Sequence, residues 1–316
     1  MVGANPVPAD SCSTLSASES LAGTAPYASA WIAIEQPGSW GRDALRSAAL
    51  PHGVGSTLAD RAKSANVGVL LIRHPHRPRQ LADGDGRTVW VAHIDTNTLI
   101  RLTINDCSDL LAWDLAALAA GNLTTAHRGT ASVTAPTPGP EPLVLVCCHA
   151  ARDACCAIHG RALYDSLLAE ASPEGAQYLW QCSHLGGHRF APTMLLLPLG
   201  AVYGRVTLPT AHAAINAAST GQLLLDHCRG RTHAPAPIQV AELDLRTALD
   251  CHGATDLHFF QESTDDSNAL VVASHLDGRT WRLNVRRQQS SLRRPVSCGT
   301  DPEIAHFWQV TNRSQQ

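Results

Sequence analysis

The sequence predicts an α/β protein that ends in a small antiparallel β appendage. Helical and extended stretches alternate through most of the 316 residues, and residues 142–148 (PLVLVCC) are almost wholly apolar, as in a strand buried on both faces. From about residue 237 the pattern changes to one helical stretch followed only by extended ones. We therefore expect a flexible N-terminal tail (1–24), an N-terminal α/β region (25–126), a linker or surface loop (127–141), a second α/β domain (142–236) and a C-terminal α+β appendage (237–316).

Composition excludes several classes of function. Charged residues make up 16% of the chain and the net charge is −3, so nothing indicates a nucleic-acid or membrane-surface partner. No apolar run reaches the ~18 residues of a membrane span, and residues 1–20 lack the basic and apolar segments of a secretory signal. These observations predict a cytoplasmic protein with no membrane and no nucleic-acid partner.

The N-terminal region is predicted to hold four strands and two helices. Helices are expected over 56–65 and over 108–121, the second capped by Ser108. Residues 127–142 are rich in Pro, Gly, Ser and Thr, which indicates the linker or loop. Apolar runs typical of strands lie at 31–36, 67–75, 87–95 and 98–104.

The second region reads in the order β-α-β-β-β-α, which is that of a thioredoxin-like unit. Its last helix is expected to start after the N-cap Thr207, with Pro209 in its first turn. Its elements are expected at 142–148, 160–171, 177–183, 193–200, 201–206 and 208–221. The appendage is expected to hold a helix at 242–253 and strands at 256–263, 269–276 and 279–288.

Two strands of the second region are each followed by side chains that bind metals. The segment CCHAARDACC follows the first strand and contains Cys147 and Cys156, and SHLGGHRF follows the second and contains His184 and His188. Between the histidines stands a Gly-Gly pair, which disfavours a helix and predicts a loop. Because the carboxyl ends of such strands face a common edge, we expect two thiols and two imidazoles to meet there.

Such a donor set leaves several interpretations open. Zinc would use it as a closed tetrahedral site, and a [2Fe-2S] cluster would use it with two cysteines on one iron and two histidines on the other. The spacing matches neither a zinc finger nor a Rieske box. Thiol redox chemistry by the vicinal cysteines, or an ordinary loop, are further possibilities, although no C-x-x-C occurs. The scattered cysteines are expected to be small buried apolar groups: Cys12, Cys107, Cys228, Cys251 and Cys298.

Several motifs make the chain resemble the sucrase/ferredoxin-like family. The central ones are LVCCHAARDACCAIHG, SHLGGHRF and LLLPLGAVYGRV, supported by LAGTAP, WIAIEQPGSWG, LLIRHP and RRPVSCG. The resemblance implies a thioredoxin-like ferredoxin domain over 142–236 with a bis-histidinyl [2Fe-2S] cluster. It places the ligands at Cys147, Cys156, His184 and His188. One departure is a cysteine where the family motif has Thr or Ser, so Cys148 and Cys155 are the alternatives if the register differs.

The resemblance implies an electron carrier rather than a stand-alone enzyme. Its partner would be a redox protein or a reductase, no catalytic residue is assigned, and reduction could couple to proton uptake on the histidines. We expect Arg152 and Arg189 to donate hydrogen bonds around the cluster or to attract an acidic partner, and His149 and Asp153 to order the loop. The alternatives are a zinc-stabilised binding module without a redox role and a thiol-based redox protein. No carboxylate pair suited to glycoside hydrolysis is evident.

Overall fold

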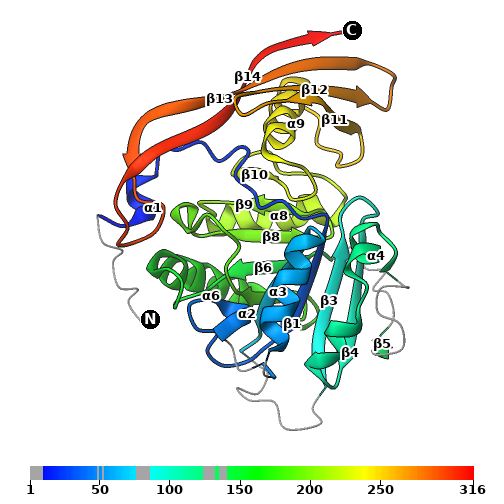
Figure 1. Ribbon diagram of the computed structural model, residues 1–316, viewed down its shortest axis with the longest axis vertical. Coiled ribbons are helices and arrows are strands. Elements are labelled where there is room, and N and C mark those ends of the chain that lie inside the picture. The colour runs from blue at the N-terminus through cyan, green and yellow to red at the C-terminus, as the bar shows by residue number, and fades with distance from the viewer. Residues whose placement is uncertain (1–9, 48–49, 52, 76–85, 124–131, 135–140) are drawn as a thin grey trace.

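The main feature of the fold is a mixed ten-stranded sheet with helices packed on it (Figure 1). The computed structural model describes residues 10–47, 50–51, 53–75, 86–123, 132–134 and 141–316. The strand order is β10-β9-β8-β6-β7-β2-β1-β3-β4-β5. The strands are β1 Ala30–Glu35, β2 Val67–Arg73, β3 Arg87–His93, β4 Thr98–Ile104, β5 Ser132–Thr134, β6 Leu143–Cys147, β7 Leu179–Cys182, β8 Met194–Leu197, β9 Ala201–Tyr203 and β10 Cys228–Arg231.

The sheet contains the same βαβββ connectivity twice. In the first unit β1 pairs with β2 in parallel and with β3 antiparallel, and β3 pairs with β4 antiparallel. In the second unit β6, β7, β8 and β9 pair in the same way. The two units join through antiparallel pairing of β2 with β7, where Ile72 lies opposite Cys182. The second unit has the order that the sequence predicts for a thioredoxin-like domain, and the N-terminal region shares its sheet.

Helices and loops cover different faces of this sheet. The helices are α1 Cys12–Leu15, α2 Ala44–Ser47, α3 Val54–Ser64, α4 Leu115–Ala119, α6 Arg161–Glu170, α7 Pro173–Ala176 and α8 Leu208–Ser219, with short turns η1 Cys107–Ala112, η2 Cys156–Gly160 and η3 His188–Phe190. Helices α3 and α4 pack on the first unit, and α6 and α8 pack on the same face of the second. The opposite face carries one core that runs across both units and includes Cys147, Cys156 and Trp180.

The chain closes with a helix and a separate four-stranded antiparallel sheet (Figure 1). Helix α9 Ala236–Leu249 packs against this sheet through Leu245, Val271 and Leu283. The strands are β11 Leu257–Thr264, β12 Asn268–His275, β13 Thr280–Arg294 and β14 Glu303–Gln315, in that spatial order. The α/β class with an antiparallel appendage is therefore confirmed.

Some predicted elements differ in detail. The single helix expected over 108–121 is two short ones, because Asp114 accepts a hydrogen bond from the Ala117 amide and so caps a new helix after η1. Strand β14 is not among the expected strands. Most of its side chains are exposed, so apolar and polar residues do not alternate along it. The predicted linker lies largely outside the described residues, apart from β5. Among the helices of the described ranges, none has the length and hydrophobicity required to cross a lipid bilayer.

The N-terminal segment is bound to the rest of the protein where the structure describes it. Residues 1–9 of the expected tail lie outside the described part, but from residue 10 onward the chain packs on the body. Cys12 is fully buried and Glu19 is 7% exposed. The amides of Gly23 and Thr24 both donate to the carbonyl of Arg229. This segment thus reaches the edge of the sheet where the candidate ligands lie.

Candidate metal centre

The ends of strands β6 and β7 bring cysteine and histidine side chains together. Cys147 is the last residue of β6 and lies opposite Cys182 of the parallel strand β7, so the segments that follow both strands leave the sheet at one edge. One ligand atom from each of Cys147, Cys156 and His184 lies within 4.8 Å of the other two. Three of the four residues singled out in the sequence therefore form one group.

Strand geometry separates the two vicinal cysteines. Successive side chains of a strand point to opposite faces. Cys147 accordingly packs in the core shared by both units, with Leu143 and Leu145, whereas Cys148 packs in the core beneath α6. Cys148 is thus on the other side of the sheet from the Cys147 group.

A close approach of backbone to backbone places Cys156 beside Cys147. Cys156 begins the π-helical turn η2, which ends at Gly160 and continues into α6. A Cβ atom on Gly160 would lie 1.9 Å from the carbonyl oxygen of Cys147, so only glycine lets the turn pack so close to the end of β6. The turn thereby brings the second thiol to the first.

The segment between the two histidines is a loop, as the glycine pair predicts. Gly186 and Gly187 have φ angles of +74° and +68°, which side chains other than glycine rarely adopt. The chain turns back on itself, and the ring centroids of His184 and His188 lie 5.0 Å apart. The loop therefore holds the two imidazoles next to each other.

His188 lies at the border of the group rather than inside it. Its side chain is buried, and its Nε2 atom lies 3.6 Å from Oδ2 of Asp153. Apart from this long contact with Asp153, no hydrogen bond of 3.5 Å or shorter with good geometry is made by the ring nitrogens of His188 or by Nδ1 of His184 among the described residues. Buried polar atoms without partners are rare and need an explanation. A metal bound by two sulfur and two nitrogen donors would supply one, so the residues present fit such a centre.

A hydrogen bond joins the side chains of Cys147 and Cys156. A hydrogen bond from Cys156 holds the pKa of Cys147 well below its usual value, against the effect of burial and with help from His184. The same hydrogen bond raises the pKa of Cys156 well above its usual value. The hydrogen bond thus favours the thiolate form of Cys147, and thiolate is the form that metals bind.

A buried arginine that the sequence did not single out supports the His loop. Arg229 on β10 is 1% exposed. Its Nη1 donates to the carbonyl of Gly186 at 3.0 Å, and its Nε donates to Oγ1 of Thr24 at 3.0 Å. Burial lowers its pKa to about 9, while the charges of Cys156 and Cys147 act in the opposite direction. Arg229 thus places a cation near the thiols, and no motif around it reveals this role.

The residues expected around the centre have different roles. His149 points away from the group: its Nε2 lies 2.6 Å from the carbonyl oxygen of Gly41, which ties the loop to the N-terminal unit. Arg152 is exposed. Arg189 forms a two-pronged ion pair with Glu19, with both distances 2.9 Å, so it is engaged within the protein. Asp153 accepts a hydrogen bond from the Cys155 amide at 2.9 Å, a contact within the segment that follows β6.

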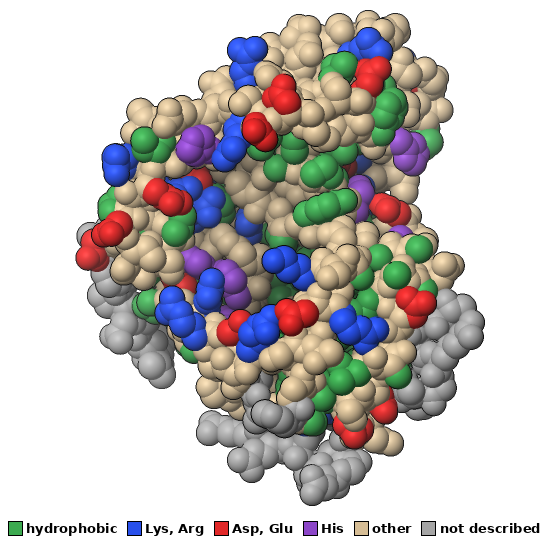
Figure 2. Space-filling view, viewed as in Figure 1, with side chains coloured by type: hydrophobic (Ala, Val, Ile, Leu, Met, Phe, Trp, Pro, Cys, Tyr) green, Lys and Arg blue, Asp and Glu red, His purple; other side chains and the backbone are tan. Residues whose placement is uncertain are grey.

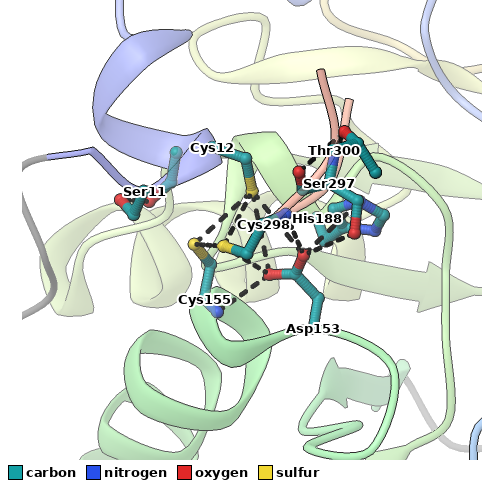
Figure 3. A network of polar contacts seen from close by, with 9 residues as sticks. Ser11, Cys12, Asp153, Cys155, His188, Ser297, Cys298 and Thr300 are labelled. Carbon is teal, nitrogen blue, oxygen red and sulfur yellow. Dashed lines mark hydrogen bonds and ion pairs between the residues drawn. The ribbon is translucent and has the colours of Figure 1, made fainter. Parts of the chain in front are cut away.

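Two further groups of metal-binding side chains occur among the described residues. Cys155 does not join the Cys147 group but lies with Cys12, Cys298 and Asp153 (Figure 3). Cys12 is fully buried, as expected, but it does not stand alone: it lies together with Cys298, which is half-buried, although 286 positions separate the two in the chain. The third group is Cys251, Asp256 and His275, near the start of the C-terminal sheet.

These features define an α/β protein with groups of cysteine, histidine and aspartate side chains that could hold a metal ion. The family model of the sucrase/ferredoxin-like proteins matches residues 21–230, well over half of the chain. The chain therefore belongs to the sucrase/ferredoxin-like family. No curated protein and no solved structure gave a match. The matched stretch contains the Cys147 group and Arg229, whereas Cys12 and Cys298 lie outside it.

Proposed function

We propose that the protein transfers electrons through a [2Fe-2S] cluster bound by Cys147, Cys156, His184 and His188. The observation that carries the proposal is the meeting of three ligand atoms within 4.8 Å of one another, with the buried ring of His188 stacked beside that of His184. The family membership of the chain supports the same ligand set. A cluster held there would supply one-electron transfer.

The residues of the chain would tune this centre through charge. Two neutral imidazoles in place of two thiolates make the ligand set less negative, and Arg229 adds a buried positive charge nearby. Both features favour acceptance of an electron. Coupling of that electron to a proton on His184 or His188 stays a prediction.

The accessible side of the centre would be the histidine side. Cys147 and Cys156 are 1% exposed, whereas His184 is partly exposed. Figure 2 shows Lys, Arg, Asp and Glu side chains around a hollow on the face seen in Figure 1, with histidines among them. The partner would be a redox protein or a reductase that docks on this side.

Purification under anaerobic conditions tests the proposal directly. We expect a coloured protein with about two irons and two acid-labile sulfides per chain. Cys147→Ser should lose the colour and the sulfide, whereas the matched variant Cys148→Ser should keep both, because its side chain lies on the other face of the sheet. A colourless wild type with zinc at Cys147 would instead support the zinc-stabilised binding module and overturn the redox function.

A further inference from the structure

Three thiols and one carboxylate converge beside the candidate cluster, from segments far apart in the chain. The Sγ atom of Cys155 lies 3.5 Å from that of Cys12 and 3.4 Å from that of Cys298 (Figure 3). The Sγ atoms of Cys12 and Cys298 lie 3.6 Å apart. Oδ1 of Asp153 lies 3.7 Å from Sγ of Cys12 and 3.6 Å from Sγ of Cys298.

We propose that Cys12, Cys155, Cys298 and Asp153 form a second metal site, separate from the Cys147 group, which binds a structural zinc ion. Zinc prefers four ligands in tetrahedral geometry, and thiolates are its favoured donors in structural sites. The proposal does not depend on the nature of the metal at Cys147. Two of the four proposed ligands, Cys12 and Cys298, lie outside the stretch that the family model matches.

The spacing of the four side chains fits zinc. With Zn–S near 2.3 Å and Zn–O near 2.0 Å, a tetrahedral site requires S···S separations of about 3.8 Å and S···O separations of about 3.5 Å. The observed values of 3.4–3.6 Å and 3.6–3.7 Å differ from these by a few tenths of an ångström. A disulfide between any two of the cysteines would require the sulfurs to approach to about 2.05 Å and would leave the third thiol unpaired.

Asp153 is held in the orientation that a ligand needs. Its Oδ2 accepts hydrogen bonds from Oγ of Ser297 and from the amide of Cys298, both at 3.0 Å. Its Oδ1 accepts one from the amide of Cys155 at 2.9 Å and is otherwise turned to the thiols. Fixed carboxylates of this kind are typical of metal sites, where outer hydrogen bonds orient the ligand.

The position of the site indicates a structural role. Cys12 belongs to the N-terminal segment, Cys155 to the loop after β6, and Cys298 to the connection between β13 and β14. A zinc ion would therefore join the two ends of the chain to the loop that carries Cys156. Since Asp153 also lies 3.6 Å from Nε2 of His188, the same ion would hold the carboxylate next to the candidate cluster.

Metal analysis of the full-length protein and four variants tests the proposal. We expect about one zinc per chain in the wild type. The X-ray absorption spectrum at the zinc edge should show three sulfur neighbours and one oxygen neighbour. Cys12→Ser and Cys298→Ser should lose most of the zinc and keep the metal bound at Cys147. Cys147→Ser should show the reverse, and the control Cys107→Ser, a buried cysteine elsewhere, should keep both metals.

A second measurement uses the unmodified protein, in case a variant fails to fold. Cys298 is partly exposed, so its thiol should react with a thiol reagent only slowly while zinc is bound and at least tenfold faster after a chelator has removed it. Immediate reaction without chelator, a disulfide between any two of the three cysteines, or zinc that persists in both Cys12→Ser and Cys298→Ser would overturn the proposal. Iron and sulfide bound at these cysteines would overturn it equally.

Discussion

Replacement of Glu19 by glutamine should lower the free energy of unfolding strongly, because the Glu19 carboxylate is buried. Glu19 is buried between two arginines: Arg294 contacts its two oxygens at 2.7 and 2.9 Å, and Arg189 contacts them at 2.9 Å. The side chains of Glu19 and Arg294 are each 5% exposed and that of Arg189 is 18% exposed. Glu19→Gln would leave two guanidinium groups facing one neutral amide.

The size of the effect follows from this burial. Removal of one partner of a buried ion pair costs about 3–5 kcal/mol, because the other charge stays buried. Glutamine keeps one accepting oxygen and Arg189 can reach some water, so we expect the lower end, about 3 kcal/mol. The control Glu262→Gln breaks an exposed pair with Arg282, at 3.0 Å, and should change the free energy of unfolding by less than about 1 kcal/mol.

The effect should depend on pH in one direction. Burial alone would raise the pKa of Glu19, but the hydrogen bonds and charges of Arg294 and Arg189 outweigh it and lower the pKa in the folded state. The pair therefore contributes its full stability above the pKa of the unfolded state, near 4.3, and loses it as pH falls through the lower folded-state pKa. The gap between wild type and Glu19→Gln should shrink in acid.

Urea denaturation followed by circular dichroism, at pH 7 and at pH 3.5 and below, measures both expectations. A free energy of unfolding for Glu19→Gln within 0.5 kcal/mol of the wild type at pH 7 would refute the assignment of this ion pair as a main contact of the N-terminal segment. A gap of equal size at every pH would show that the loss comes from packing rather than from charge.

Three further predictions concern the candidate metal centre. Arg229→Met should lower the reduction potential, roughly by tens of millivolts in a redox titration, because it removes a buried positive charge that interacts with Cys156 and Cys147. An unchanged potential would contradict it. Gly187→Ala should lose more stability and more metal than Gly186→Ala. A Cβ on Gly187 would lie 2.4 Å from Arg229, whereas a Cβ on Gly186 would meet nothing within 4 Å. Equal losses of the two variants in thermal unfolding would refute this difference. Gly160→Ala should cost over about 2 kcal/mol in urea denaturation and deplete the metal, because its Cβ would collide with the Cys147 carbonyl; a native-like variant would show that the turn can move.

Local pattern determined much of the fold and part of the candidate centre. The strands and helices of the second unit follow from apolar periodicity, and the Thr207 cap with Pro209 in the first turn of α8 agrees with the predicted start. The Gly186–Gly187 pair identified a loop, because positive φ angles are a property of single residues. Cys147, Cys156 and His184 could be placed together because Cys147 ends β6, Cys156 lies in the segment after it, and His184 follows shortly after the neighbouring strand β7.

Tertiary structure alone decided which distant side chains meet. The pairing of β2 with β7, which makes one sheet of two units, depends on an edge contact that leaves no trace in the local pattern of either strand. Cys12 lies 143 positions from Cys155 and 286 from Cys298, yet the three sulfurs lie within 3.6 Å of their neighbours. Periodicity reports which face of an element is buried, whereas the partner across a core depends on how whole elements pack. For that reason Glu19, Arg229 and the second cysteine group emerge only in the folded chain.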